Sequence, residues 1–111
     1  MKSSIAGGRS AAGVRPLFAL GRVVATPTAL YALKQCGIDP MRLLERHVTG
    51  DWGDLHPVDV RQNELGARLG LRILSSYPMG PEDLPPASRP LLWIVTEANR
   101  GTTTFLLPED Y

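Results

Sequence analysis

The spacing of apolar residues changes along the chain and divides it into an extended start, a helical middle and an extended end. Residues 17–25 are rich in Leu, Phe and Val and stop before a Thr-Pro dipeptide, which predicts a strand. Between residues 27 and 69 apolar residues recur every three or four positions, as they do on one face of a helix. Residues 71–77 instead alternate in steps of two, which is typical of a strand.

Start and stop signals divide the helical middle into three helices. Three dipeptides place a residue that can cap a helix before a proline: Thr26-Pro27, Asp39-Pro40 and His56-Pro57. Asp54 is an alternative cap for the third helix. Glycines at positions 37, 50 and 70 favour the left-handed backbone that ends a helix. We therefore expect helices over about residues 27–36, 40–49 and 57–69.

The second half of the chain predicts three strands, at residues 71–77, 91–97 and 102–107. Residues 78–90 hold five prolines and should form a long irregular connection. Asn99 and Gly101 mark a turn between the last two strands. The three strands pair most simply as an antiparallel meander. The predicted fold is α+β: a single small domain with an N-terminal strand, about three helices and a three-stranded antiparallel meander.

Composition and charge add an N-terminal arm to this picture. At 111 residues, 43% of them hydrophobic and 21% charged, the chain resembles one globular domain. Residues 1–14 show no periodicity and few large apolar groups, so we expect a flexible basic arm there and one α+β domain over residues 15–111. Residues 1–38 contain basic but no acidic side chains. Such a segment either contacts nucleic acid or an acidic partner, or is a solvated tail.

Several classes of protein are disfavoured by what the sequence lacks. Cys36 is the single cysteine and cannot form an internal disulfide, which fits a reducing, cytoplasmic compartment. No apolar run is long enough for a secretory signal or a membrane span, so we expect no membrane association. Ligand spacings for zinc, a phosphate-binding glycine loop and a nucleophile elbow are all missing. We therefore expect no metal and no cofactor.

The densest polar cluster follows the second predicted helix. His47 lies close in sequence to Asp51 and Trp52. A carboxylate beside a histidine can hold it in one tautomer and raise its pKa, which suits general acid or base catalysis. His47 is thus a candidate catalytic residue, and Asp51 and Trp52 are candidate binding residues. The alternative is structural: Trp52 fills the core, an aspartate caps the next helix, and His47 bonds a backbone carbonyl.

A second cluster lies where the last two strands meet. Thr96, Arg100 and Thr103 would converge there and could hold a phosphate or an oxyanion, with Arg100 and Thr103 as catalytic candidates and Thr96 as a binding candidate. The alternative is that the threonines favour strands and that Arg100 is a solvated turn residue. Arg72 and Tyr77 are weaker binding candidates, because alternation places them on opposite faces of their strand unless a bulge intervenes.

Several segments together resemble a family of short proteins encoded on plasmids and integrative elements of proteobacteria. The matching segments are LFALGRVVATP (17–27), RHxxGDWGDL (46–55), NE (63–64), WIVTE (93–97) and TTxLLP (103–108), where x is any residue. Members are labelled plasmid-related proteins or restriction-system subunits. The resemblance implies the biology of bacterial mobile elements and brings no activity with it. A restriction methyltransferase would need a longer chain and a cofactor-binding motif.

The predicted order of elements is also similar to the small metal-independent ribonuclease fold of barnase, RelE and colicin-type toxins. In that class, His, Arg, Tyr and Thr or Ser side chains on a sheet face bind and cleave RNA, which is an expectation by analogy of fold. We therefore expect an RNA-directed protein, with a ribonuclease as one form of it. The alternatives are a non-enzymatic inhibitor or interaction module that acts on a host defence complex (restriction or CRISPR), or a structural accessory domain. The sequence does not decide between enzyme and inhibitor.

Overall fold

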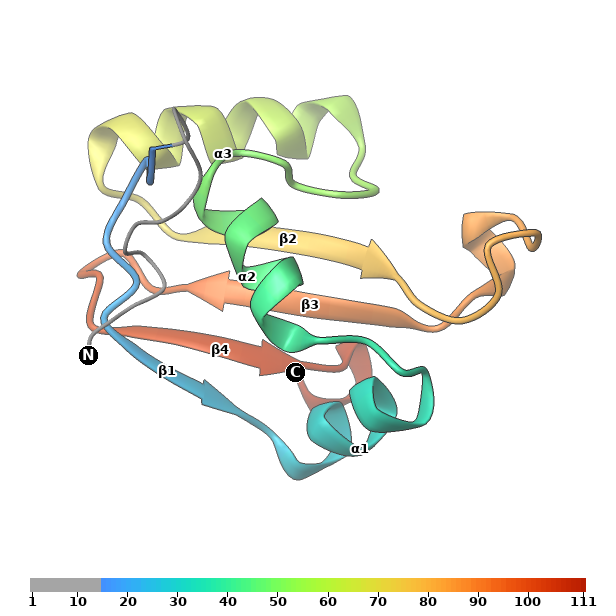
Figure 1. Cartoon of the computed structure of the whole chain (residues 1–111). Coiled ribbons are helices and arrows are strands. Elements are labelled where there is room, and N and C mark those ends of the chain that lie inside the picture. The colour runs from blue at the N-terminus through green and yellow to red at the C-terminus, as the bar shows by residue number, and fades with distance from the viewer. Residues whose placement is uncertain (1–14) are drawn as a thin grey trace.

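The computed structural model describes residues 15–111 and has three helices packed on a four-stranded sheet (Figure 1). The elements are β1 (Arg22–Ala25), α1 (Pro27–Gln35), α2 (Pro40–Val48), α3 (Pro57–Leu69), β2 (Ile73–Pro78), β3 (Leu91–Thr96) and β4 (Thr102–Leu106), with short 3₁₀ turns at Pro86–Ser88 and Pro108–Asp110. The predicted α+β class is confirmed. The predicted arm, residues 1–14, lies outside the described residues. Within residues 15–111, none of the helices has the length and apolar character needed to cross a membrane.

All three helices begin at the caps that the sequence predicts. The Thr26 hydroxyl accepts a hydrogen bond from the Ala29 N–H at 3.1 Å, which satisfies one free donor of the first turn of α1. The Asp39 carboxylate serves α2 in the same way. For α3 the cap is His56, whose Nδ1 accepts from the Val58 N–H at 3.2 Å. The proline after each cap fits the first helical position, where no N–H is needed.

The sheet has the strand order β1-β4-β3-β2 and is mixed. Strands β2, β3 and β4 form the antiparallel meander that the sequence predicts. The meander is only part of the sheet, because β1 adds a fourth strand that runs parallel to β4. This first strand begins at Arg22 rather than at residue 17. Gly21 interrupts the expected extended run with a φ of 65°, and a side chain there would collide with the Arg100 carbonyl.

The two faces of the sheet have different surroundings, and we call them inner and outer. The inner face is covered by α1 and α2, and Figure 1 shows α2 crossing in front of the strands. Its residues are buried or nearly so: Ile73, Ser75, Tyr77, Leu92, Ile94, Thr96, Thr103 and Phe105. By alternation along the strands, the outer face holds Arg72, Leu74, Ser76, Trp93, Val95, Thr104 and Leu106.

The edge of the sheet at β2 is closed by hydrogen bonds from outside the sheet. The Asn63 amide on α3 donates to the Leu74 carbonyl at 2.7 Å and accepts from the Leu74 N–H at 3.1 Å. Further along, the Ser76 N–H donates to the Trp52 carbonyl, and the Asp54 N–H donates to the Ser76 carbonyl. The backbone groups of this edge are therefore paired, which protects it from pairing with another chain.

Candidate functional site

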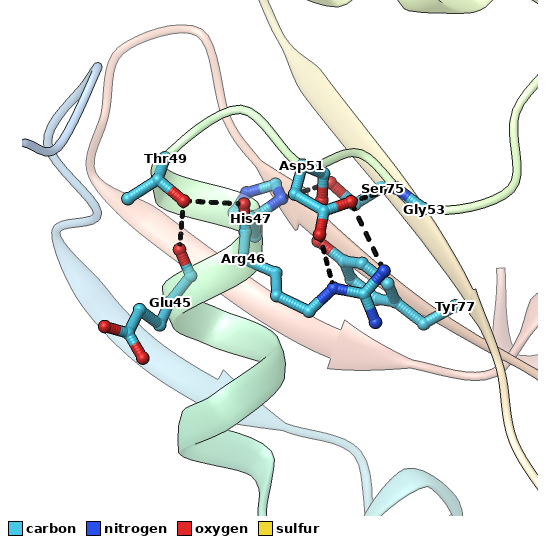
Figure 2. A network of polar contacts seen from close by, with 8 residues as sticks. All are labelled: Glu45, Arg46, His47, Thr49, Asp51, Gly53, Ser75 and Tyr77. Carbon is cyan, nitrogen blue, oxygen red and sulfur yellow. Dashed lines mark hydrogen bonds and ion pairs between the residues drawn. The ribbon is translucent and has the colours of Figure 1, made fainter. Parts of the chain in front are cut away.

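A continuous hydrogen-bonded chain of side chains runs through the core beneath α2. The His47 ring is fully buried, with Nδ1 2.6 Å from the Ser75 hydroxyl and Nε2 2.9 Å from the Thr96 hydroxyl. Figure 2 shows the His47 side chain on α2 close to Ser75 on β2. The Thr96 hydroxyl is 2.8 Å from that of Thr103, which donates to the Leu20 carbonyl at 2.7 Å. We call this set of five residues the imidazole–hydroxyl chain.

The Leu20 carbonyl at one end of the imidazole–hydroxyl chain determines which group donates each hydrogen bond in it. Thr103 gives its single proton to the Leu20 carbonyl, so it can only accept from Thr96. Thr96 has then used its own proton and must accept from Nε2 of His47. Nδ1 is left as the acceptor for the Ser75 hydroxyl. The imidazole is therefore a neutral Nε2–H tautomer, and both of its nitrogens are in use.

Burial has a strong effect on the titration of His47. Removal from water, reinforced by the positive charge of Arg100, lowers the pKa of His47 to about 3. A raised pKa is the expectation when the neighbour is a carboxylate, but the neighbours here are hydroxyl groups. The rings of Phe18 and Trp52 pack around the imidazole, with centroids at 5.2 and 6.2 Å. At neutral pH this histidine is uncharged and surrounded by protein.

Arg100 is bound to backbone carbonyls. Its guanidinium donates to the carbonyls of Leu71 (2.7 Å), Gly66 (2.8 Å) and Glu97 (3.1 Å). These bonds tie the end of α3 to the β3–β4 turn, where Arg100 takes an unusual φ of 59°. Within residues 15–111 it forms no hydrogen bond to the imidazole–hydroxyl chain, and its guanidinium lies over the Phe18 ring at 5.3 Å. The structure therefore joins His47 and Thr103 through Thr96 and holds Arg100 apart from them.

The loop after α2 places Asp51, Trp52 and Tyr77 together. Arg46 forms a two-point ion pair with Asp51, at 2.7 and 3.3 Å, which lowers the pKa of Asp51 (Figure 2). The buried Tyr77 hydroxyl donates to the Asp51 carbonyl at 2.7 Å, and its ring lies under the Arg46 guanidinium. Trp52 is 5% exposed and fills the core, and its Nε1 has no partner among residues 15–111. These contacts anchor the loop to the inner face.

A different group of side chains reaches solvent on the outer face, where Arg72 and Tyr111 are exposed and Trp93 is half-buried. The Tyr111 ring meets the Trp93 ring edge to face at 5.7 Å, and the Arg72 guanidinium lies over the Tyr111 ring at 4.9 Å. Arg72 also lies 3.9 Å from Glu97. Tyr111 is 67% exposed, whereas Val95, next to Trp93 on the same face of β3, is 2% exposed. We call Arg72, Trp93 and Tyr111 the outer-face cluster.

A groove of about 520 Å³ adjoins the outer-face cluster. Its lining includes Asp59 and Gln62 of α3 and Leu74 of β2. Arg72 and Trp93 belong both to this groove and to the cluster. The sequence interpretation included Arg72 and omitted Trp93 and Tyr111. Alternation could have found Trp93, because it occupies an outward position of β3, but no local pattern marks Tyr111.

Neither the described residues nor the comparisons with known proteins identify a metal centre or a family. Within residues 15–111, no group of three or more His, Cys, Asp or Glu side chains is placed to hold a metal ion. No family model, curated protein or solved structure matches the chain. The resemblance to plasmid-related proteins therefore stays a prediction from sequence.

Proposed function

We propose that the protein is a non-enzymatic interaction module that binds a protein partner through its outer sheet face. The observation that carries this proposal is the solvent-accessible outer-face cluster beside a groove. Trp, Tyr and Arg are the residues that most often dominate binding energy at protein interfaces. A groove beside such a cluster can receive a side chain of the partner. A host defence complex as that partner is an expectation from the sequence resemblance.

The surroundings of the catalytic candidates are unfavourable for catalysis, so a binding function is better supported than an enzymatic one. A general acid or base must come within hydrogen-bonding distance of the proton that it transfers. Both ring nitrogens of His47 are already bonded, and the ring is buried. Thr103 is buried and donates to a carbonyl, and Arg100 is bound to three carbonyls. Catalysis by His47 and Thr103 would require the core to open, and catalysis by Arg100 would require it to leave these carbonyls.

RNA is the second candidate partner, because nucleic-acid bases stack on exposed aromatic rings and on arginine. Trp93, Tyr111 and Arg72 offer such a platform. Affinity for RNA depends mainly on basic residues that contact phosphates. Glu97 beside Arg72, and Glu109 two positions before Tyr111, oppose that attraction. The charge of this face therefore favours a protein over RNA.

The proposal is tested by capture experiments in which immobilised full-length protein is exposed to host-cell extract, with and without ribonuclease. Tyr111→Ala removes the most exposed ring of the cluster. Tyr31→Ala is a matched control, because Tyr31 on α1 is 66% exposed, close to the 67% of Tyr111. We expect a stoichiometric protein that resists ribonuclease treatment, is lost with Tyr111→Ala and is kept with Tyr31→Ala.

Two results would overturn this assignment. Direct binding of a short labelled single-stranded RNA, lost with Trp93→Ala and Tyr111→Ala, would favour the RNA-directed function at the same face. RNA cleavage that disappears with His47→Gln, while the variant stays folded by circular dichroism, would restore the ribonuclease.

A further inference from the structure

The edge of the sheet at β1 presents backbone groups that face away from the sheet. The N–H groups of Arg22 and Thr26 donate inward, to carbonyls of β4 and of the turn before it, at 3.0 and 2.9 Å. Because successive residues of a strand point their backbone groups to opposite sides, Val23 and Ala25 point theirs outward. No residue within 15–111 bonds to these four groups. In Figure 1, β1 is the lowest strand, with no described helix or strand beyond it.

The two edges of the sheet thus differ in how their outward backbone groups are paired. Along β2, the Asn63 amide and the segment around Gly53 pair with the backbone. Along β1, Val23 is 43% exposed, and residues 22–25 contain no proline or lysine. Proline and lysine are two residues that commonly keep an edge strand from pairing with other chains. An edge that residues 15–111 leave open, opposite one that they close, suggests that β1 pairs with another strand.

We propose that the strand paired with β1 is β1 of a second copy of this chain, antiparallel and related by a two-fold axis at Val24. In that register Val23 of each copy exchanges two hydrogen bonds with Ala25 of the other, which gives four in total. Val24 meets its own symmetry mate in the closer kind of antiparallel pair. The two four-stranded sheets would then form one continuous sheet of eight strands.

Charge complementarity supports a second copy in this register. Arg22 of one copy lies opposite Thr26 of the other, on the same face, with Cα atoms about 4.5 Å apart. The Thr26 hydroxyl donates to the Asp110 carboxylate at 2.8 Å, and Thr28 donates to it at 2.6 Å. Hydrogen bonding by Thr28 lowers the pKa of Asp110, so this exposed carboxylate is charged at neutral pH. Symmetry then supplies two ion pairs between Arg22 and Asp110, while Arg22 does not face its own mate.

Sedimentation equilibrium of the full-length protein over a range of concentrations tests the dimer. The wild type should approach twice the mass of one chain as concentration rises. Arg22→Glu and Asp110→Arg should each raise the dissociation constant at least about tenfold, because each places like charges together. An equimolar mixture of the two variants should dimerise again, because both contacts between unlike copies become attractive. Arg61→Glu changes an exposed residue of α3 and should leave the dissociation constant unchanged.

The mixing experiment keeps the proposal open to refutation even if one variant is less stable, since misfolding cannot restore a dimer on mixing. A wild type that stays monomeric at all concentrations, or a mixture that does not dimerise, would overturn it. Hydrogen exchange of the Val23 and Ala25 amides adds a second test. Their protection should rise with protein concentration. Protection that is independent of concentration would mean that the same chain covers this edge, and would overturn the proposal.

Discussion

The two faces of the sheet use polar residues for opposite purposes. On the inner face, Ser75, Thr96 and Thr103 join His47 in a chain in which every proton has an acceptor. On the outer face, Trp93 and Tyr111 are combined with a charged group and remain in contact with solvent. Residue types that suggest catalysis are therefore buried on the inner face, whereas residue types that suit binding are accessible to solvent on the outer face. The environment of a polar group, more than its chemical type, decides its role.

The largest effect on stability is expected for His47→Ala. The change leaves the Ser75 and Thr96 hydroxyls buried without their partner and creates a cavity under α2. We expect the free energy of unfolding to fall by about 3 kcal/mol or more. Urea denaturation followed by circular dichroism measures it. A loss below about 1 kcal/mol would mean that the inner chain does not stabilise the fold.

The pH dependence of stability should carry the signature of the buried neutral His47. The pKa of His47 is about 3 in the folded protein, against about 6.5 when the chain is unfolded. Between these values only the unfolded state binds the proton, so stability must fall as the pH falls. We expect a loss of about 2 kcal/mol between pH 6.5 and pH 4.5. Chemical denaturation at each pH measures it.

The carboxylates affect stability over a separate pH range in the same experiment. The lowered pKa values of Asp51 and Asp110 stabilise the fold above about pH 4, and that contribution is lost only below it. His47→Gln should therefore flatten the profile between pH 6.5 and pH 4.5 and keep the decline below pH 4. A variant with the wild-type slope would assign the pH dependence to other groups.

Thr103 and Thr104 are neighbours on opposite faces and allow a matched comparison. Thr103→Val removes the donor to the Leu20 carbonyl and the acceptor for Thr96, so we expect a loss of about 1–3 kcal/mol. Thr104→Val changes a half-buried outer residue and should stay within about 0.5 kcal/mol of the wild type. Thermal or urea unfolding of both variants measures the difference. Equal effects would contradict the distinction between the faces.

The smallest effect on stability is expected on the outer face. Tyr111→Ala removes an aromatic contact with Trp93 from a residue that is largely exposed, so it should cost less than about 1 kcal/mol. The same change should abolish capture of the partner. Melting temperature and capture from extract are measured on the same preparation. A large loss of stability together with loss of capture would make Tyr111 part of the scaffold.

Much of the fold follows from local signals in the sequence. The caps at Thr26, Asp39 and His56 locate the helices, since capping depends only on neighbouring residues. Turn residues and alternation locate the meander. The place of β1 beside β4 could not be predicted in this way. It joins Arg22 to Thr102, 80 positions away, and such pairing is decided by tertiary packing.

The site was harder to predict than the fold, for a physical reason. His47 and Asp51 are close in sequence, which suggests a histidine–carboxylate pair, but Asp51 instead pairs with Arg46. The true partners of His47 come from β2 and β3, 28 and 49 residues away. A hint exists in the alternation of β2, which places Ser75 on a buried apolar face, where a hydroxyl needs a partner.

The protonation of the His47 ring tests the distinction between the two faces most directly. Nitrogen-15 chemical shifts of both ring nitrogens, followed from pH 8 to pH 5, report charge and tautomer together. The account predicts a neutral Nε2–H imidazole with constant shifts over this whole range. A ring that becomes an imidazolium near its ordinary pKa, or one that carries its proton on Nδ1, would contradict it and return His47 to the candidates for acid–base catalysis.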